Sequence, residues 1–195
     1  MKKLFKILIL FTITFTLFAC SKKNNVSNTN KIEKTEETTA SAIKLTEMPI
    51  DNLDFQTMEI MDGKIIKSEE FYKDKPITLV NVWGTFCGPC KEEMPDLAKL
   101  YETYKDKVNF LGVVADTNAN MDTNVEEAQK IIKESGVNYI NIMPNPTMED
   151  NLANITAIPT TFFVNSEGKI LGGFVGKADK DGLAATIEKV IEENK

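Results

Sequence analysis

The chain has 195 residues and is acidic, with 23 lysines and arginines against 29 aspartates and glutamates and a formal net charge of −6. This balance argues against nucleic acid as a partner and against attraction to anionic lipid by charge. The sequence has no histidine and only three cysteines. A four-ligand zinc or iron–sulfur site therefore cannot be completed from imidazoles and thiolates, and we expect no metal.

The N-terminus has the pattern of an export signal, with a basic stretch at residues 1–6 and an apolar run at residues 7–18. The apolar run is too short to span a bilayer comfortably, so we expect residues 1–19 to be a signal peptide. The next residue, Cys20, completes a segment that resembles a bacterial lipobox, and this resemblance implies lipidation of its thiol. The alternative is an uncleaved signal anchor in which Cys20 has no role. Both interpretations place the rest of the chain outside the cytosol.

Residues 20–45 are expected to be the lipidated cysteine followed by a disordered tether. The segment is polar, lacks aromatic residues and has no apolar period, so it buries too little surface to order itself. A flexible coil of about 25 residues spans roughly 25 to 30 Å. The remaining residues, 46–195, are enough for a single domain with a proper core.

The first part of this domain predicts a short β element, with strands at residues 52–60 and 65–71 and a turn at residues 62–63. Two apolar runs of strand length follow, at residues 77–83 and 108–116. The segment between these two runs has helical periodicity. Strand, helix and strand in this order predict a right-handed parallel crossover.

In the second half, a helix is predicted from Thr123 to Gly136, because Thr123 and Glu126 form a capping-box signature. A short strand is expected at residues 137–143, followed by a loop and a short helix. The rest of the chain predicts a hairpin and a last helix, at residues 160–165, 169–175 and 182–193. The chain is therefore expected to be α/β, with a central mixed sheet and helices on both sides.

Two cysteines, Cys87 and Cys90, lie where the strand at residues 77–83 is expected to give way to a helix. Two thiols at this spacing can form a reversible disulfide. The unpaired N–H groups and positive end of the helix favour the thiolate of Cys87, which makes Cys87 the nucleophile and Cys90 the resolving thiol. The spacing alone also occurs in zinc and haem sites, but the chain has no histidine and Lys91 follows the second cysteine. A redox pair or a small structural disulfide remains.

Residues 46–195 resemble the thioredoxin superfamily, and within it the membrane-anchored TlpA/ResA branch. The resemblance is carried by WGTFCGPC, by the following KEEMP and by AIPTTFFVNSEGKI. It implies a thioredoxin-like fold with an N-terminal β extension and a central insertion at residues 117–157. It also implies a cis peptide bond at Pro159, packed beside the cysteines. The residues that it implies as substrate contacts are Trp83, Gly88, Pro89, Ile158 and Pro159.

The resemblance further implies a role for Glu93. Thioredoxins carry a buried aspartate six residues before the first cysteine, where this chain has Asn81, which cannot accept a proton. Glu93 lies one helical turn after Cys90, and the branch has a glutamate at this position near the thiols. We therefore expect Glu93 to transfer the proton of Cys90. The alternative is that Glu93 belongs to a solvated cluster in the first turn, where the helix dipole favours acids.

The function implied is an extracytoplasmic, membrane-tethered thiol:disulfide oxidoreductase that reduces disulfides in exported proteins. Its electrons would come from a membrane thiol donor of the CcdA/DsbD type, and its only redox group would be the Cys87–Cys90 disulfide, with no bound cofactor. We expect a monomer. Cytochrome c maturation is the family's best-known duty. The alternatives are a disulfide oxidant, a thiol-dependent peroxidase and a non-catalytic lipoprotein, although Thr85 does not have the spacing from the cysteine that the peroxidase motif requires.

Overall fold

The computed structural model describes residues 40–118 and 122–195. The predicted signal peptide, Cys20 and most of the predicted tether lie outside the described residues. Within the described ranges, every helix is too short or too polar to cross a membrane.

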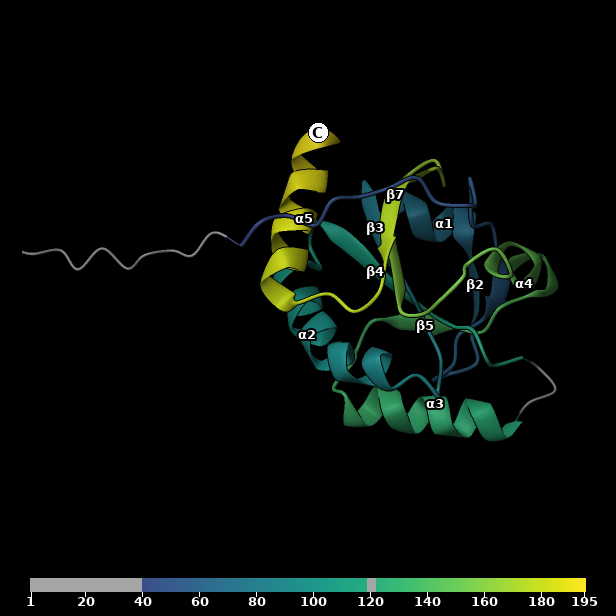
Figure 1. Ribbon diagram of the computed structural model, residues 1–195. Coiled ribbons are helices and arrows are strands. Elements are labelled where there is room, and N and C mark those ends of the chain that lie inside the picture. Colours follow the sequence, from purple (N-terminus) through teal and green to yellow (C-terminus); the bar gives the residue numbers. More distant parts are fainter. Residues whose placement is uncertain (1–39, 119–121) are drawn as a thin grey trace, which may run out of the picture. The chain divides into compact units, whose positions relative to one another are not determined.

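The centre of the described fold is a mixed sheet in the order β5-β4-β3-β6-β7 (Figure 1). The pairs β3–β4 and β4–β5 are parallel, and the pairs β3–β6 and β6–β7 are antiparallel. The strand bounds are β3 Ile77–Trp83, β4 Val108–Val114, β5 Ile140–Ile142, β6 Thr160–Asn165 and β7 Ile170–Val175. Strands β3 and β4 are buried at every position, which explains why they read as continuous apolar runs.

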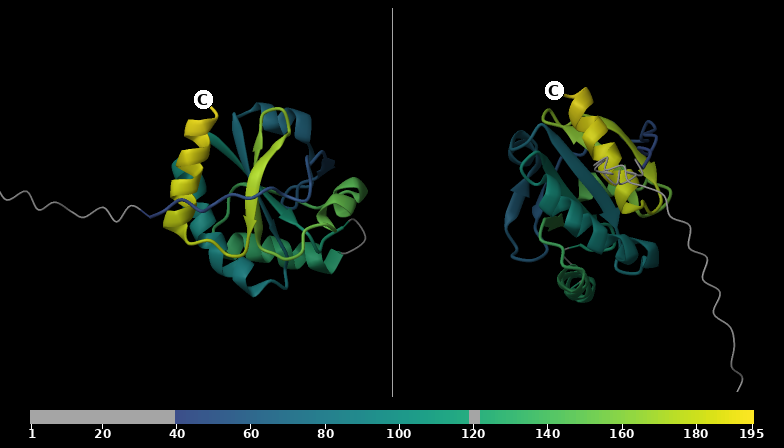
Figure 2. Two further views of the ribbon diagram at one scale, coloured as in Figure 1. Left: turned by 45° about the horizontal axis from the view of Figure 1, so that its top comes forward. Right: turned by 90° about the vertical axis from the view of Figure 1, so that its left-hand side faces the viewer.

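Side chains alternate between the two faces of the sheet, so each face has its own core. Leu79 packs under α2 (Gly88–Tyr104), α3 (Asp122–Glu134) and α5 (Lys180–Glu193), whereas Val80 packs on the opposite side. That opposite side is covered by the N-terminal segment, α1 (Ser68–Lys73) and α4 (Pro146–Leu152). The three views show helices on both sides of the sheet (Figures 1 and 2). The predicted α/β architecture is confirmed.

The N-terminal extension differs from the prediction in one element. Strands β1 (Gln56–Met58) and β2 (Ile65–Lys67) form the expected antiparallel hairpin, and Gly63 takes a positive φ of 73° in its turn. The predicted second strand, residues 65–71, ends early because α1 begins at Ser68. Buried Tyr72 donates a hydrogen bond to the Leu53 carbonyl at 2.8 Å, and an ion pair joins its neighbour Lys73 to a residue one turn earlier. The ion pair has the i,i+4 spacing of a helix, and the Tyr72 hydrogen bond ties α1 to the segment before β1.

The domain begins earlier than the predicted boundary at residue 46. The Ile43 amide donates to Thr186 Oγ1 at 2.8 Å, and Ile43 and Leu45 pack against the core beside α5. Thr46 exchanges two backbone hydrogen bonds of 2.9 Å with Gly173, which extends the sheet beyond the edge strand β7. The last residues of the predicted tether are therefore part of the folded domain, because they cover an edge and an apolar surface that the sequence alone does not reveal.

The central insertion, residues 117–157, contains α3, β5 and α4. Helix α3 begins at Asp122, so Thr123 lies inside the helix and the predicted N-cap position is wrong by at least one residue. Strand β5 is shorter than the predicted 137–143, because only residues 140–142 pair with β4. Helix α4 is capped by Asn145, whose side chain accepts from the Met148 amide at 2.9 Å. The insertion therefore adds an edge strand and a helix on each side of the sheet.

Candidate active site

Cys87 and Cys90 form a disulfide at the start of α2. Cys87 is the N-cap of the helix, and its sulfur lies 3.2 Å from the Cys90 amide nitrogen, which donates to it. Pro89 lies in the first turn, where a missing N–H leaves no intrahelical bond unmade. Cys87 keeps 6% exposure and Cys90 has none. An approaching sulfur therefore meets Cys87 first, as the predicted roles require.

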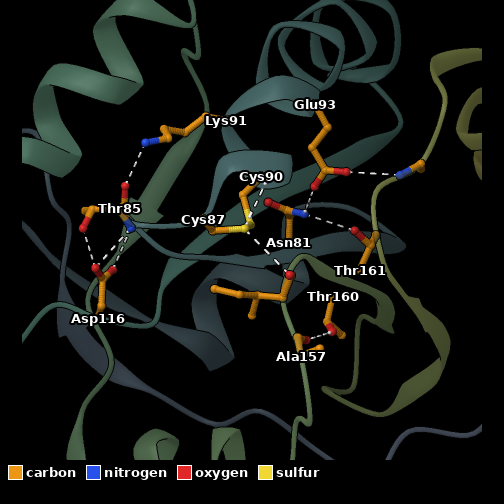
Figure 3. The surroundings of a disulfide bond; sticks show 12 residues. Asn81, Thr85, Cys87, Cys90, Lys91, Glu93, Asp116, Ala157, Thr160 and Thr161 are labelled. Carbon is orange, nitrogen blue, oxygen red and sulfur yellow. Dashed lines mark hydrogen bonds between the residues drawn. A yellow bond between two sulfur atoms is a disulfide. The ribbon is translucent and has the colours of Figure 1, made fainter.

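The loop before β6 brings a backbone edge to the cysteines. The Ile158–Pro159 peptide bond is cis, which confirms the prediction at this position. The Ile158 carbonyl oxygen lies 3.7 Å from Cys87 Sγ (Figure 3). The oxidised sulfur has no proton, so this is a contact and not a hydrogen bond. The loop is closed by Thr160, whose hydroxyl donates to the Ala157 carbonyl at 2.6 Å.

Glu93 faces the interior and is 4% exposed. Its carboxylate accepts from Asn81 Nδ2 at 2.9 Å and from the Ala178 amide at 3.2 Å. Burial raises the pKa of Glu93 to about 7, against the opposing effect of these two hydrogen bonds and of Lys177. Its neighbour Glu92 is exposed and pairs with Lys177 at 2.8 Å. The two adjacent glutamates therefore differ in environment: Glu92 is exposed to solvent, and Glu93 is buried.

Asn81 occupies the position where thioredoxins carry an aspartate, and here it connects two elements. Its amide nitrogen donates both to Glu93 and to Thr161 Oγ1, the latter at 3.1 Å (Figure 3). Asn81 is 1% exposed and lies in β3, opposite Thr161 of β6. An amide can donate to an ionised carboxylate at this place without adding a second buried charge. Asn81 therefore fixes the carboxylate of Glu93 in space.

The prediction that Trp83 contacts the substrate is wrong. Its side chain is completely buried, and its indole nitrogen donates to Asn141 Oδ1 at 3.0 Å. Trp83 therefore belongs to the buried core that also contains the two cysteines. The exposed aromatic residue is Phe86, directly before Cys87, with 74% of its surface exposed. The available signal was an apolar residue next to the nucleophile in a loop, which the sequence reasoning passed over.

An apolar groove runs beside the cysteines, with a volume of about 480 Å³. Phe86 and Ile158 line it on the side of the cysteines, and Leu152 and Ile155 line it from α4 and the loop that follows. The insertion therefore contributes to the surface next to the reactive sulfur. Gly88 and Pro89 are exposed on the other side of Cys87, whereas Pro159 is buried.

The sequence reasoning also missed Asp116, which lies just beyond the end of β4. Its carboxylate accepts hydrogen bonds from Thr85, two residues before Cys87 (Figure 3). A carboxylate at the end of a strand carries no sequence signal for this contact, because its partner is 31 residues away. Among the described residues, no three acidic, cysteine or histidine side chains converge as a metal site would require.

A CxxC disulfide at the start of a helix, beside a cis-proline edge on a mixed sheet, defines the thioredoxin-fold class of oxidoreductases. The sequence pattern of the Redoxin family matches residues 46–191, and the chain belongs to that family.

Individual relatives agree with this assignment. The chain is 28% identical over 131 residues to the thiol-disulfide oxidoreductase ResA of Bacillus cereus (strain ZK / E33L), across 67% of this chain and 71% of the relative. It is 30% identical over 115 residues to ResA of Bacillus subtilis (strain 168), across 58% and 60%. The thioredoxin domain of a thiol-disulfide oxidoreductase from Bacteroides vulgatus has the same fold, with a TM-score of 0.60, 24% identity and coverage of 75% and 99%. By family and relatives, the chain is a thiol:disulfide oxidoreductase.

Proposed function

We propose that this oxidoreductase works outside the cytosol and reduces disulfides in other exported proteins. The observation that supports disulfide exchange with a protein substrate is the asymmetry of the pair, in which only Cys87 is accessible and the Ile158 carbonyl borders its sulfur. An extended substrate segment can lie along this backbone edge and bring its own disulfide to Cys87.

The reaction balances as a two-electron exchange. The Cys87 thiolate attacks one sulfur of the substrate disulfide; a mixed disulfide forms and the other substrate sulfur leaves as a thiolate. Cys90 then loses its proton to Glu93 and attacks Cys87 Sγ, which releases the second substrate thiolate. The substrate is reduced and the Cys87–Cys90 disulfide is formed. A membrane thiol donor of the CcdA/DsbD type would return the two electrons.

The reducing direction is supported by the residues around the pair. Gly88 and Pro89 between the cysteines and Ile158 before the cis proline match thioredoxin. Thioredoxin has a potential of about −270 mV, whereas the oxidant DsbA lies near about −120 mV. A redox titration of the purified chain against glutathione or dithiothreitol tests the direction. A potential near that of thioredoxin fits a reductant, and one near that of DsbA would reverse the proposal.

Insulin reduction measured beside peroxide consumption tests the activity itself. We expect insulin to be reduced by the parent, and both Cys87→Ser and Cys90→Ser to abolish turnover. Cys90→Ser should in addition retain substrates on Cys87 as mixed disulfides, because no resolving thiol remains. Peroxide consumption that exceeds insulin reduction would favour the peroxidase instead.

The location is proposed from the N-terminal pattern, with Cys20 as the lipid site. The acidic composition offers no second means of holding the chain to an anionic membrane. We therefore expect Cys20→Ser to release the protein from the membrane fraction or to stop its processing. Normal processing with unchanged membrane retention would support the signal anchor.

A further inference from the structure

The loop that joins β3 to Cys87 is held by a carboxylate from another strand. Asp116 lies two residues beyond β4, whose last residue, Val114, pairs with Trp83 at the end of β3. The Thr85 amide nitrogen lies 3.0 Å from Asp116 Oδ1 and 3.1 Å from Oδ2, and the Thr85 hydroxyl also donates to Oδ2 (Figure 3). Both donors of Thr85 are therefore bound to one carboxylate.

The carbonyl group of Thr85 also has a hydrogen-bond partner, which comes from α2. Lys91, one turn into α2, donates from Nζ to the Thr85 carbonyl at 3.2 Å. The Cys87 amide donates to the Gly84 carbonyl at 3.0 Å, which closes a tight turn around Thr85. A Cβ added to Gly84 would lie 3.1 Å from the side chains of both Phe86 and Ile158, so the loop has little space in which to move.

Asp116 is itself anchored to the insertion. Its backbone carbonyl accepts from Asn124 Nδ2 of α3 at 2.6 Å. The chain of contacts runs from α3 through Asp116 to Thr85, and Cys87 follows two residues later. These hydrogen bonds connect the insertion to the loop of the nucleophile.

We propose that Asp116 is a positioning residue, which acts through Thr85 to keep Cys87 at the N-terminus of α2 when the disulfide is reduced. In the oxidised protein the S–S bond itself holds Cys87 next to Cys90. After reduction this covalent link is gone, and the sulfur is left with its backbone and its contacts to the Cys90 amide and the Ile158 carbonyl, so the loop contributes to its place. Asp116 contacts neither sulfur and takes no part in bond making. The inference requires only that Cys87 is the reacting thiol.

The sign of the change at Cys87 distinguishes positioning from a simple charge effect. The charged side chains labelled around the disulfide in Figure 3 are Lys91 and Glu93 of α2 and Asp116 beyond β4. A carboxylate near a thiol raises the thiol pKa, so removing its charge alone would lower the pKa of Cys87. Releasing Cys87 from the helix N-terminus would instead raise its pKa and slow its reaction, because the thiolate loses its N–H donors.

The test is the pH dependence of Cys87 alkylation by iodoacetamide in the reduced full-length chain, followed by mass spectrometry on the peptide that contains Cys87. In Asp116→Asn, the amide can accept from one donor of Thr85 but presents its own N–H₂ to the other. We expect alkylation to slow by about tenfold, as for loss of one hydrogen bond to a charged group, with a raised apparent pKa. Thr85→Val removes only the hydroxyl and should give a smaller change in the same direction.

The double variant decides whether the two residues act as one unit. The Thr85 hydroxyl acts here through residue 116, so the double variant should lose less than the sum of the losses in the two single variants. Thr85→Ser keeps the hydroxyl and should behave as the parent. Asp150→Asn, which removes an exposed carboxylate from α4, serves as the charge control.

Three results would overturn the proposal. A lowered pKa in Asp116→Asn with an unchanged Thr85→Val would indicate a charge effect. Additive losses in the double variant would show that the residues act separately. Parent rates in both single variants would show that the contact does not position Cys87. Alkylation needs no substrate protein, so these outcomes are independent of whether the chain reduces exported proteins, and Thr85→Val reports on the contact even if Asp116→Asn fails to fold.

Discussion

At the scale of single residues, the site contains a buried carboxyl group that accepts a hydrogen bond from an amide. Glu93 loses its solvation in the core, and this loss raises its pKa to about 7. The donors Asn81 and Ala178 favour the ionised form and oppose the effect of desolvation, as the charge of Lys177 also does. A general base is most effective when its pKa lies near the working pH. The burial of Glu93 therefore suits it to take the proton of a buried thiol.

The same burial makes the stability of the protein depend on pH. In the folded protein the pKa of Glu93 lies above its ordinary value of 4.5, because the protonated carboxyl group is favoured in the core. The stabilisation from this difference is fully present below about pH 4.5 and is lost as the pH rises through about 7. We expect the oxidised parent to lose about 3 kcal/mol more than Glu93→Gln over this range, given 1.36 kcal/mol per pKa unit. Urea unfolding at a series of pH values measures it. Parallel stability curves for the two proteins would show that Glu93 ionises as it does in water.

The kinetic prediction for Glu93 concerns the resolution step. Glu93→Gln should keep the disulfide but slow the attack of Cys90 on a preformed mixed disulfide by on the order of a hundredfold at neutral pH. In the parent, the resolution rate should rise with pH through about 7, the pKa of Glu93. Glu92→Gln, at the exposed neighbouring carboxylate, is the matched control and should follow the parent. Identical pH–rate curves for Glu93→Gln and the parent would remove Glu93 from the mechanism.

At the scale of elements, the site is assembled at one end of the sheet. Strand β3 supplies Asn81 and leads into the loop before Cys87, α2 supplies both cysteines and Glu93, and β6 begins beside the cis-proline loop. The insertion adds α4, so the apolar groove has one wall that a minimal thioredoxin fold lacks. The loop residue Phe86 lines the same groove.

We predict that Phe86 contributes to substrate binding and not to the chemistry of the thiol. Burying a phenylalanine side chain stabilises a complex by roughly 1.5 to 3 kcal/mol, so Phe86→Ala should raise the KM for a protein disulfide about tenfold or more. Alkylation of reduced Cys87 by iodoacetamide should not change. Ile65→Ala, at an exposed apolar residue of β2, is the control and should leave KM as it is. An unchanged KM in Phe86→Ala would exclude this surface from substrate binding.

At the scale of the whole molecule, residues 43–46 contact two separate parts of the domain. This segment pairs with the sheet at Gly173 and packs Ile43 and Leu45 against the core beside α5. These contacts join residues more than 120 positions apart. Residues 43–46 are thus packed against the domain at both of these places.

A shortened chain tests this role. A protein that begins at residue 47 should be less stable than one that begins at residue 40 by on the order of 3 kcal/mol, from lost apolar burial and lost hydrogen bonds. Thermal unfolding should shift by roughly 10 °C for a domain of this size. Thr186→Val in the longer protein removes the acceptor of the Ile43 amide, together with the hydrogen bond from the hydroxyl to the Gly182 carbonyl, and should account for a minor part of the loss. Equal stability of the proteins that begin at residues 40 and 47 would show that residues 40–46 do not stabilise the domain.

The sequence by itself determined those features that depend on local signals. Continuous apolar runs indicated β3 and β4 as buried strands, and the residues between them indicated α2 and a parallel crossover. The spacing of Cys87 and Cys90 at a helix start indicated a redox pair, and the motif around Pro159 indicated its cis bond. Each of these depends on neighbours within a few residues or on a motif that is contiguous in the chain.

Only the tertiary structure decided which polar and aromatic residues lie at the site and which residues they contact. Trp83 is buried and donates from its indole to Asn141, 58 residues later, whereas Phe86, three residues after Trp83, is exposed. Asp116 reaches Thr85 across the ends of two strands, and Thr186 binds the Ile43 amide from 143 residues away. The free energy of such contacts comes from groups that meet only when the sheet has formed. Local sequence propensity does not predict these contacts, because the burial of a side chain and its partners are properties of the packed molecule.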